Sequence, residues 1–294
     1  MSTRKKNNFV GYLFASPWLI GFLVFGIYPI IISLYYSLCQ YDVLRIPQYI
    51  GFRNYEELLF QDNYFYNAIW NTLYYTVIRT PLVILGSLIL AIIVSKALTG
   101  VKIFRTIYFI PSIITGVILS VLWMWLLNPE LGLVNSMLSY FGIQGPLWLL
   151  DPGYSKPSII MMSLWSLGGG RMLVFLAAIQ NVPSQLYEAV EIDGGNWWNK
   201  FKNVTIPYIS PVLFLWFVLE MIFSLQVFVE AYIMTKGGPV NSTMFYNLYL
   251  YNKAFDDFDM GYASALAWLL FIIGGIITFI QFRLSKKWVF NSGE

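Results

Sequence analysis

Residues 181–208 read NVPSQLYEAVEIDGGNWWNKFKNVTIPY and lie between two long apolar stretches of the chain. Residues 186–192 have helical spacing, and the Gly194-Gly195 pair ends this helix because glycine tolerates the left-handed conformation of a sharp turn. Residues 197–204 predict a second short helix that ends before Pro207. We therefore expect two short helices joined by a glycine elbow, which form a stiff projection rather than a passive connector.

Six apolar stretches account for most of the remaining chain. Their approximate ranges are 10–38, 69–97, 106–127, 158–181, 210–234 and 261–283. A helix needs about 20 apolar residues to cross a membrane. The chain is 58% hydrophobic and 11% charged, whereas soluble domains have about 25% charged residues. The sequence predicts an all-α membrane protein with about six transmembrane helices, arranged as a single domain over residues 1–294.

The basic residues predict the orientation of these helices. With the N-terminus inside, the cytoplasmic segments hold Arg4, Lys5, Lys6, Lys96, Lys102, Arg105, Lys200, Lys202, Arg283, Lys286 and Lys287. The outer segments hold fewer, namely Arg45, Arg53, Lys156, Lys236 and Lys253. Because cytoplasmic loops carry an excess of Lys and Arg, both termini and the segment at about 182–209 are expected in the cytoplasm.

The composition argues against catalysis and metal binding by this chain. It has no histidine, the commonest metal ligand and general base near neutral pH, and Cys39 is its one cysteine. It has no Gly-Lys dipeptide and therefore no phosphate-binding loop of the G-x-x-x-x-G-K-[ST] type. We expect no catalytic residue, no metal site, no cofactor of its own and no nucleic-acid partner.

The segment at about 182–209 resembles the EAA signature of the permease subunits of binding-protein-dependent ABC importers. Six positions match the family's pattern at its spacing: Glu188, Ala189, Asp193, Gly194, Phe201 and Pro207. Val190 and Gly195 are small departures from it. Other segments, such as Gly51–Tyr55 and Thr235–Pro239, resemble the carbohydrate-uptake branch, the maltose-type and glycerol-3-phosphate-type permeases.

This resemblance implies a permease subunit that forms half of a translocation path and is not an enzyme. The EAA segment would dock on a cytoplasmic ATPase, and the two ATPase subunits would bind ATP and Mg. The other implied partners are a second homologous permease and an extracellular solute-binding protein that delivers a carbohydrate. This carbohydrate is expected to be an oligosaccharide, and an acidic oligosaccharide is one of the alternatives. A heterodimer of permeases is expected, although a homodimer is also compatible with the sequence. The implied location is the bacterial cytoplasmic membrane.

Three ionisable residues, Arg79, Arg171 and Glu220, fall near the middle of predicted spans. Arg79 and Arg171 lie at depths of roughly 15 and 20 Å, at about 1.5 Å per residue. A charge there costs at least about 2.5 kcal/mol and should face a cavity or a partner. In one interpretation, an arginine pairs with Glu220 and the charges only fix helix packing.

In the other interpretation, at least one arginine faces the path. Two arginines against one carboxylate leave a positive charge that would attract an acidic or hydroxyl-rich sugar. The candidate path residues are Arg79, Gly170, Arg171, Glu220, Phe223 and Ser224.

Two other functions are alternatives to the importer. An ion-coupled secondary transporter commonly shows an internal repeat, and none is visible. An intramembrane lipid-modifying enzyme would need paired acids near a membrane face, but the tight acidic cluster at residues 256–259 reads as solvated.

The glycines at 168–170 have two interpretations. They either permit close helix contact or mark local unwinding of the helix along a cavity.

Overall fold

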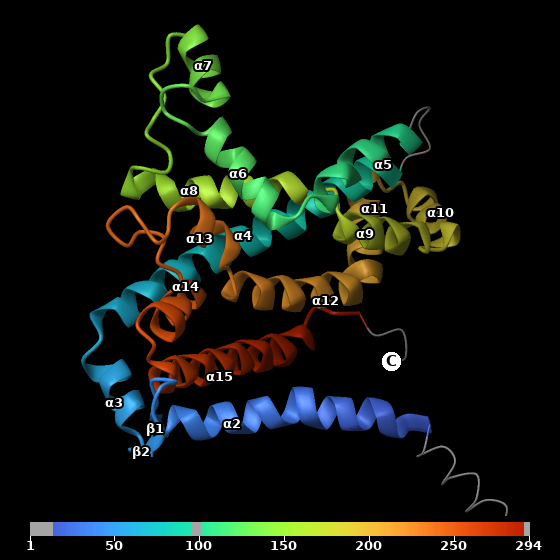
Figure 1. Ribbon diagram of the computed structural model, residues 1–294. Coiled ribbons are helices and arrows are strands. Elements are labelled where there is room, and N and C mark those ends of the chain that lie inside the picture. Colours follow the sequence, from blue (N-terminus) through green and yellow to red (C-terminus); the bar gives the residue numbers. More distant parts are fainter. Residues whose placement is uncertain (1–13, 96–100, 291–294) are drawn as a thin grey trace, which may run out of the picture. The chain divides into compact units, whose positions relative to one another are not determined.

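The structure, a computed structural model, describes residues 14–95 and 101–290 (Figure 1). The described residues are mostly helical and contain a short antiparallel pair of strands, β1 (Cys39–Gln40) and β2 (Gln48–Tyr49). Residues 10–13 and 96–97, which belong to predicted apolar stretches, lie outside the described range.

Four helices are long and apolar enough to cross a membrane: Phe14–Ser37, Asn63–Ser95, Trp197–Met234 and Met260–Ser285. Two helix pairs pass the same test together but are bent. Ile103–Ile113 and Gly116–Leu126 meet at 97°, and Pro152–Ser166 and Gly170–Gln180 meet at 51°. With each bent pair counted as one span, the described residues hold six spans. The predicted all-α membrane fold with about six transmembrane helices is confirmed.

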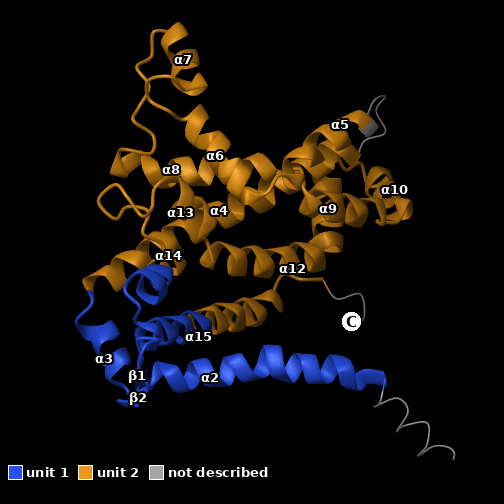
Figure 2. Cartoon of the chain, viewed as in Figure 1, with its two compact units in different colours: residues 1–62, 250–272 blue, residues 63–249, 273–294 orange. Residues whose placement is uncertain are grey.

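The chain divides into two compact units (Figure 2). Residues 1–62 and 250–272 form one unit, and residues 63–249 and 273–294 form the other. The prediction of a single domain stays a prediction, because compactness alone does not show which parts fold independently.

The first unit contains η1 (Leu23–Ile27), α2 (Tyr28–Ser37), α3 (Arg53–Phe60) and η5 (Asn252–Asp256). The second contains α4 (Asn63–Ser95), α5 (Val101–Phe109), η2 (Ile110–Ile113), α6 (Gly116–Leu126), α7 (Leu133–Tyr140), α8 (Pro152–Ser163), η3 (Leu164–Ser166), α9 (Gly170–Gln180), α10 (Ser184–Ile192), α11 (Trp197–Lys200), η4 (Phe201–Thr205), α12 (Ile206–Leu225) and α13 (Val229–Met234). Residues of α14 (Tyr246–Tyr251) and α15 (Met260–Ser285) occur in both units.

In the first unit, a buried asparagine holds the end of the first span to the segment that follows it. The Asn54 side-chain amide donates to the carbonyls of Ser37 and Cys39, each at 2.9 Å. The amide of Gly261 donates to the Tyr41 carbonyl at 3.1 Å, so the start of α15 is bonded to the same turn. Gly51–Tyr55, which the sequence analysis selected, and the start of the last span therefore have structural roles in this unit.

In the second unit, α4 packs against α8, α9 and α12. Ala91 of α4, Phe175 of α9 and Ile209 of α12 are buried in one apolar cluster. A second cluster contains Tyr75 of α4 and Trp123 of α6. Since lipid tails are as apolar as these side chains, close van der Waals packing rather than hydrophobic transfer stabilises such contacts within a membrane.

The glycines at 168–170 combine both interpretations given to them. The helix is interrupted between Ser166 and Gly170, where the chain bends by 51°. A Cβ on Gly168 would also overlap the backbone carbonyl of Tyr108, at the end of α5. The glycines therefore permit both a break in the helix and a close backbone approach.

One boundary predicted from the sequence is wrong. The second short helix does not end before Pro207, because α11 continues through the π-helical turn η4 directly into α12. Pro207 lies in the first turn of α12, and the wide turn before it accommodates a residue that has no amide proton to donate. The expected second helix is therefore the first part of the fifth span.

We expect Gly168→Ala to destabilise the protein, because relief of the overlap with the Tyr108 carbonyl requires a backbone shift. Overpacking of this kind costs about 1–3 kcal/mol. The measurement is the Tm of the purified protein in detergent. Gly170→Ala is the matched control, since a Cβ there meets no atom within 4 Å. Equal Tm values for the two variants would contradict the close approach.

Candidate functional site

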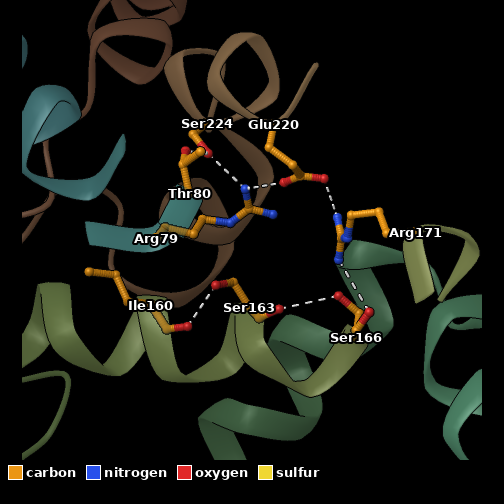
Figure 3. A network of polar contacts seen from close by, with 8 residues as sticks. All are labelled: Arg79, Thr80, Ile160, Ser163, Ser166, Arg171, Glu220 and Ser224. Atoms are coloured by element: carbon orange, nitrogen blue, oxygen red, sulfur yellow. Dashed lines mark hydrogen bonds and ion pairs between the residues drawn. The ribbon is translucent and has the colours of Figure 1, made fainter. Parts of the chain in front are cut away.

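Three charged side chains from three different helices meet inside the second unit (Figure 3). Arg79 of α4 donates through Nη1 to Oε2 of Glu220, in α12, at 2.9 Å. Arg171 of α9 donates through Nη1 to the other oxygen, Oε1. The side chain of Glu220 is 1% exposed and those of both arginines are 13% exposed. One buried carboxylate therefore binds two arginines that are far apart in the sequence.

Neighbouring polar groups fix the two guanidinium groups in place. Arg79 also donates to the hydroxyl of Ser224 at 2.7 Å, and that hydroxyl lies 3.2 Å from the hydroxyl of Thr80. Arg171 donates through Nη2 to the carbonyl of Ser166 at 3.2 Å. This last bond joins the two sides of the helix break, because Ser166 precedes the glycines and Arg171 follows them.

A cavity of about 340 Å³ lies against this cluster. Its lining includes five of the six residues predicted for a substrate path: Arg79, Gly170, Arg171, Glu220 and Phe223. The sixth, Ser224, is 1% exposed and supports Arg79. Segments beside three helix breaks line the cavity, namely the breaks that precede α6, α9 and α13. Broken helices around a cavity are typical of binding sites in transporters.

Glu230 also lines this cavity, and the sequence analysis did not select it. It stands in the first turn of α13 and within the apolar stretch at 210–234. The rule that selected Glu220, an ionisable residue inside a predicted span, could have found it. With Glu230 included, the cavity has two arginines and two glutamates, so the expected leftover positive charge is offset within the cavity.

The segment after the fourth span forms the predicted turn between two helices. Glu188 and Ala189 are exposed on α10, which ends at Ile192, and Asp193 is its C-cap. Gly194 has φ of +75°, a conformation that side chains disfavour, and its amide donates to the Glu191 carbonyl at 3.0 Å. The glycine elbow predicted from the sequence is confirmed.

Contacts between the two short helices stiffen this segment. Lys200 of α11 pairs with Glu191 of α10. The ring of Phe201 stacks on that of Trp197, with centroids 5.5 Å apart. Ile192 is 87% exposed at the turn. The segment is thus braced internally and exposes the apolar side chain of Ile192 at its turn.

Comparison with known proteins identifies the family. The model of the binding-protein-dependent transport system inner membrane component family matches residues 101–290. The chain belongs to this family. Its members are permease subunits, so the chain is a transport subunit and not an enzyme. The family description also agrees with the predicted multi-pass membrane location.

Relatives of the permease match it over nearly its whole length. The probable ABC transporter permease protein YesP of Bacillus subtilis (strain 168) is 38% identical over 289 residues, covering 97% of this chain and 93% of that one. The lactose transport system permease protein LacF of Rhizobium radiobacter is 34% identical over 292 residues, covering 97% of each chain.

A solved structure resembles the permease closely. It is a crystal structure of a bacterial alginate ABC transporter in complex with an alginate pentasaccharide-bound periplasmic protein. One of its chains superposes with a TM-score of 0.86 and 26% identity, and the match covers 96% of both chains. The six-span fold with its two bent pairs is therefore similar to a permease fold seen experimentally.

We expect Glu220→Gln to destabilise the permease more than Arg171→Met does. Glu220→Gln leaves two buried arginines without a counter-charge, whereas Arg171→Met leaves an ion pair intact. Removing one partner from a buried pair costs about 3–5 kcal/mol. The measurement is the Tm in detergent, with Glu130→Gln, an exposed carboxylate outside the cluster, as the control. A Glu220→Gln protein as stable as this control would contradict the buried cluster.

Proposed function

We propose that this permease forms half of the translocation path of an ATP-driven importer that carries a carbohydrate. The observation that supports it most directly is the cavity of the second unit, bounded by helix breaks and lined by two arginines and two glutamates. Relatives named for lactose and for arabinooligosaccharides, each above 30% identity, support a carbohydrate as the substrate class.

The partners follow from the importer architecture. A second homologous permease completes the path, two cytoplasmic ATPase subunits bind ATP and Mg, and an extracellular solute-binding protein delivers the sugar. The complex lies in a bacterial cytoplasmic membrane with both permease termini in the cytoplasm, as the distribution of basic residues indicates. We propose a heterodimer of permeases, and a homodimer is the alternative that purification would reveal.

We propose that the segment at about 182–209 couples the ATPase to the membrane helices. Glu188, Ala189, Asp193, Gly194, Phe201 and Pro207 would form or support the docking surface. The two access states of a transporter differ in free energy, and a partner that binds one of them better shifts the balance. A braced element such as this one can transmit that preference.

A hydroxyl-rich oligosaccharide is the first candidate substrate, and Arg79, Gly170, Arg171, Glu220, Phe223 and Ser224 are its proposed path. An acidic oligosaccharide is the second candidate. The similarity to a transporter described as importing the acidic polysaccharide alginate favours it, whereas the two glutamates of the cavity offset its two arginines.

The function is tested by assembly and uptake. We expect the permease to copurify with a second permease and an ATPase, and vesicles that contain this complex to take up oligosaccharide when ATP and a loaded binding protein are supplied. Transport by this chain and the ATPase alone would contradict the heterodimer. A complete complex that carries no carbohydrate would contradict the proposed function.

We expect Gly194→Val to abolish uptake while the protein still inserts into the membrane. A Cβ at Gly194 meets no atom within 4 Å, so the penalty comes from its left-handed backbone, about 1–2 kcal/mol. Gly194→Asn is the matched control, because asparagine tolerates this conformation better than valine. Uptake is measured in vesicles with equal amounts of each variant. Normal transport by Gly194→Val would remove the elbow from the coupling mechanism.

A further inference from the structure

Glu230 differs from every other charged group of the cavity. Glu220 is bound by two arginines, and each arginine is bound by Glu220. The carboxylate of Glu230 accepts no hydrogen bond and forms no ion pair among residues 14–95 and 101–290. Its side chain is only partly buried and lines the cavity. Both of its oxygens are thus available to whatever occupies this space.

The serine hydroxyls that line the same cavity have partners already. Ser112 donates to the Phe109 carbonyl at 2.7 Å, and Ser163 donates to the Ile160 carbonyl at 2.6 Å. Ser166 donates to the carbonyl of Ser163 at 3.2 Å. Within the described part of the chain, Glu230 is therefore the cavity's charged acceptor that lacks a donor.

A free carboxylate in such a place discriminates between sugars by charge. It accepts hydrogen bonds from sugar hydroxyls, and bonds to an ionised acceptor are roughly twice as strong as those between neutral groups. It repels a second carboxylate, and this repulsion is stronger in a cavity than in bulk water because the effective dielectric constant is lower. Two arginines against Glu220 leave one surplus positive charge, and Glu230 offsets the attraction that this surplus would otherwise exert on an acidic sugar.

We propose that Glu230 contacts the carbohydrate in the path and sets its charge preference, by accepting hydroxyl hydrogen bonds and by holding back sugars that carry a carboxylate. The inference rests on the proposed function and deepens it. Glu230 lies ten residues after Glu220 on the span Trp197–Met234, and the expected topology puts it nearer the outer face. A sugar entering from outside would therefore meet Glu230 before the arginine cluster.

The experiment compares uptake of two sugars by the complete importer in vesicles. The probes are a neutral trisaccharide and a trisaccharide of the same size with one uronic acid, each supplied with saturating binding protein. Glu230→Gln keeps the shape of the side chain and removes its charge, so we expect the acidic-to-neutral uptake ratio to rise on the order of tenfold. Glu230→Ser, smaller and also uncharged, should raise the same ratio and is measured in parallel.

Two controls separate a contact in the path from general effects of charge. Glu230→Asp retains the carboxylate, so its acidic-to-neutral uptake ratio should differ from that of the wild type by no more than about twofold, the size of effect expected from a small structural change. Glu130→Gln removes an exposed carboxylate that does not line the cavity and should leave the ratio unchanged.

An unchanged ratio in both uncharged variants would overturn the inference, as would an equal loss of both sugars. A wild-type complex that carries neither sugar would overturn the proposed function, and the inference with it.

Discussion

The arrangement of the helices around the cavity depends on one carboxylate held between two arginines. In a membrane interior an isolated charge is costly, so Arg79 and Arg171 can remain there only while Glu220 lies between them. This requirement brings α4, α9 and α12 together at one point. Removal of Glu220 would leave two cations buried, whereas removal of either arginine leaves a pair. The cluster therefore restricts helix positions more strongly than the surrounding apolar packing does, since apolar side chains can exchange neighbours or contact lipid at little cost.

The cavity exists because the helices around it are interrupted. A continuous helix satisfies its own backbone groups and leaves none for a substrate. Here the breaks before α6, α9 and α13 end at the cavity, and Arg171 bonds across one of them to the carbonyl of Ser166. The same break requires glycine at position 168, where the backbone of Tyr108 comes too close for a side chain. Helix packing and the shape of the cavity thus depend on the same few residues.

The span Trp197–Met234 connects the two proposed functional regions. Its first residues form the second helix of the coupling segment, and Glu220 and Glu230 stand further along it. Because α11 continues into α12 without a loop, we expect a displacement of the coupling segment to reach Glu220 on α12, whereas Glu230 lies beyond the break that precedes α13. The sequence predicted a separate short helix that ended before Pro207. The continuous helix offers a more direct connection, and the π-helical turn at Phe201–Thr205 makes it possible.

The sequence by itself determined the membrane fold, the number of spans and the glycine elbow, because these follow from local properties: apolar length, helix spacing and the conformational freedom of Gly194. It also selected Arg79, Arg171 and Glu220, since a charge near the middle of an apolar stretch is conspicuous, but it did not select Glu230, which lies close to the end of its stretch. It could not assign their partners, because pairing depends on which helix faces meet, and residues 79 and 220 are far apart in the chain. Only the tertiary structure showed that both arginines bind one carboxylate, that the Ser224 hydroxyl accepts a hydrogen bond from Arg79, and that Glu230 lines the same cavity unpaired.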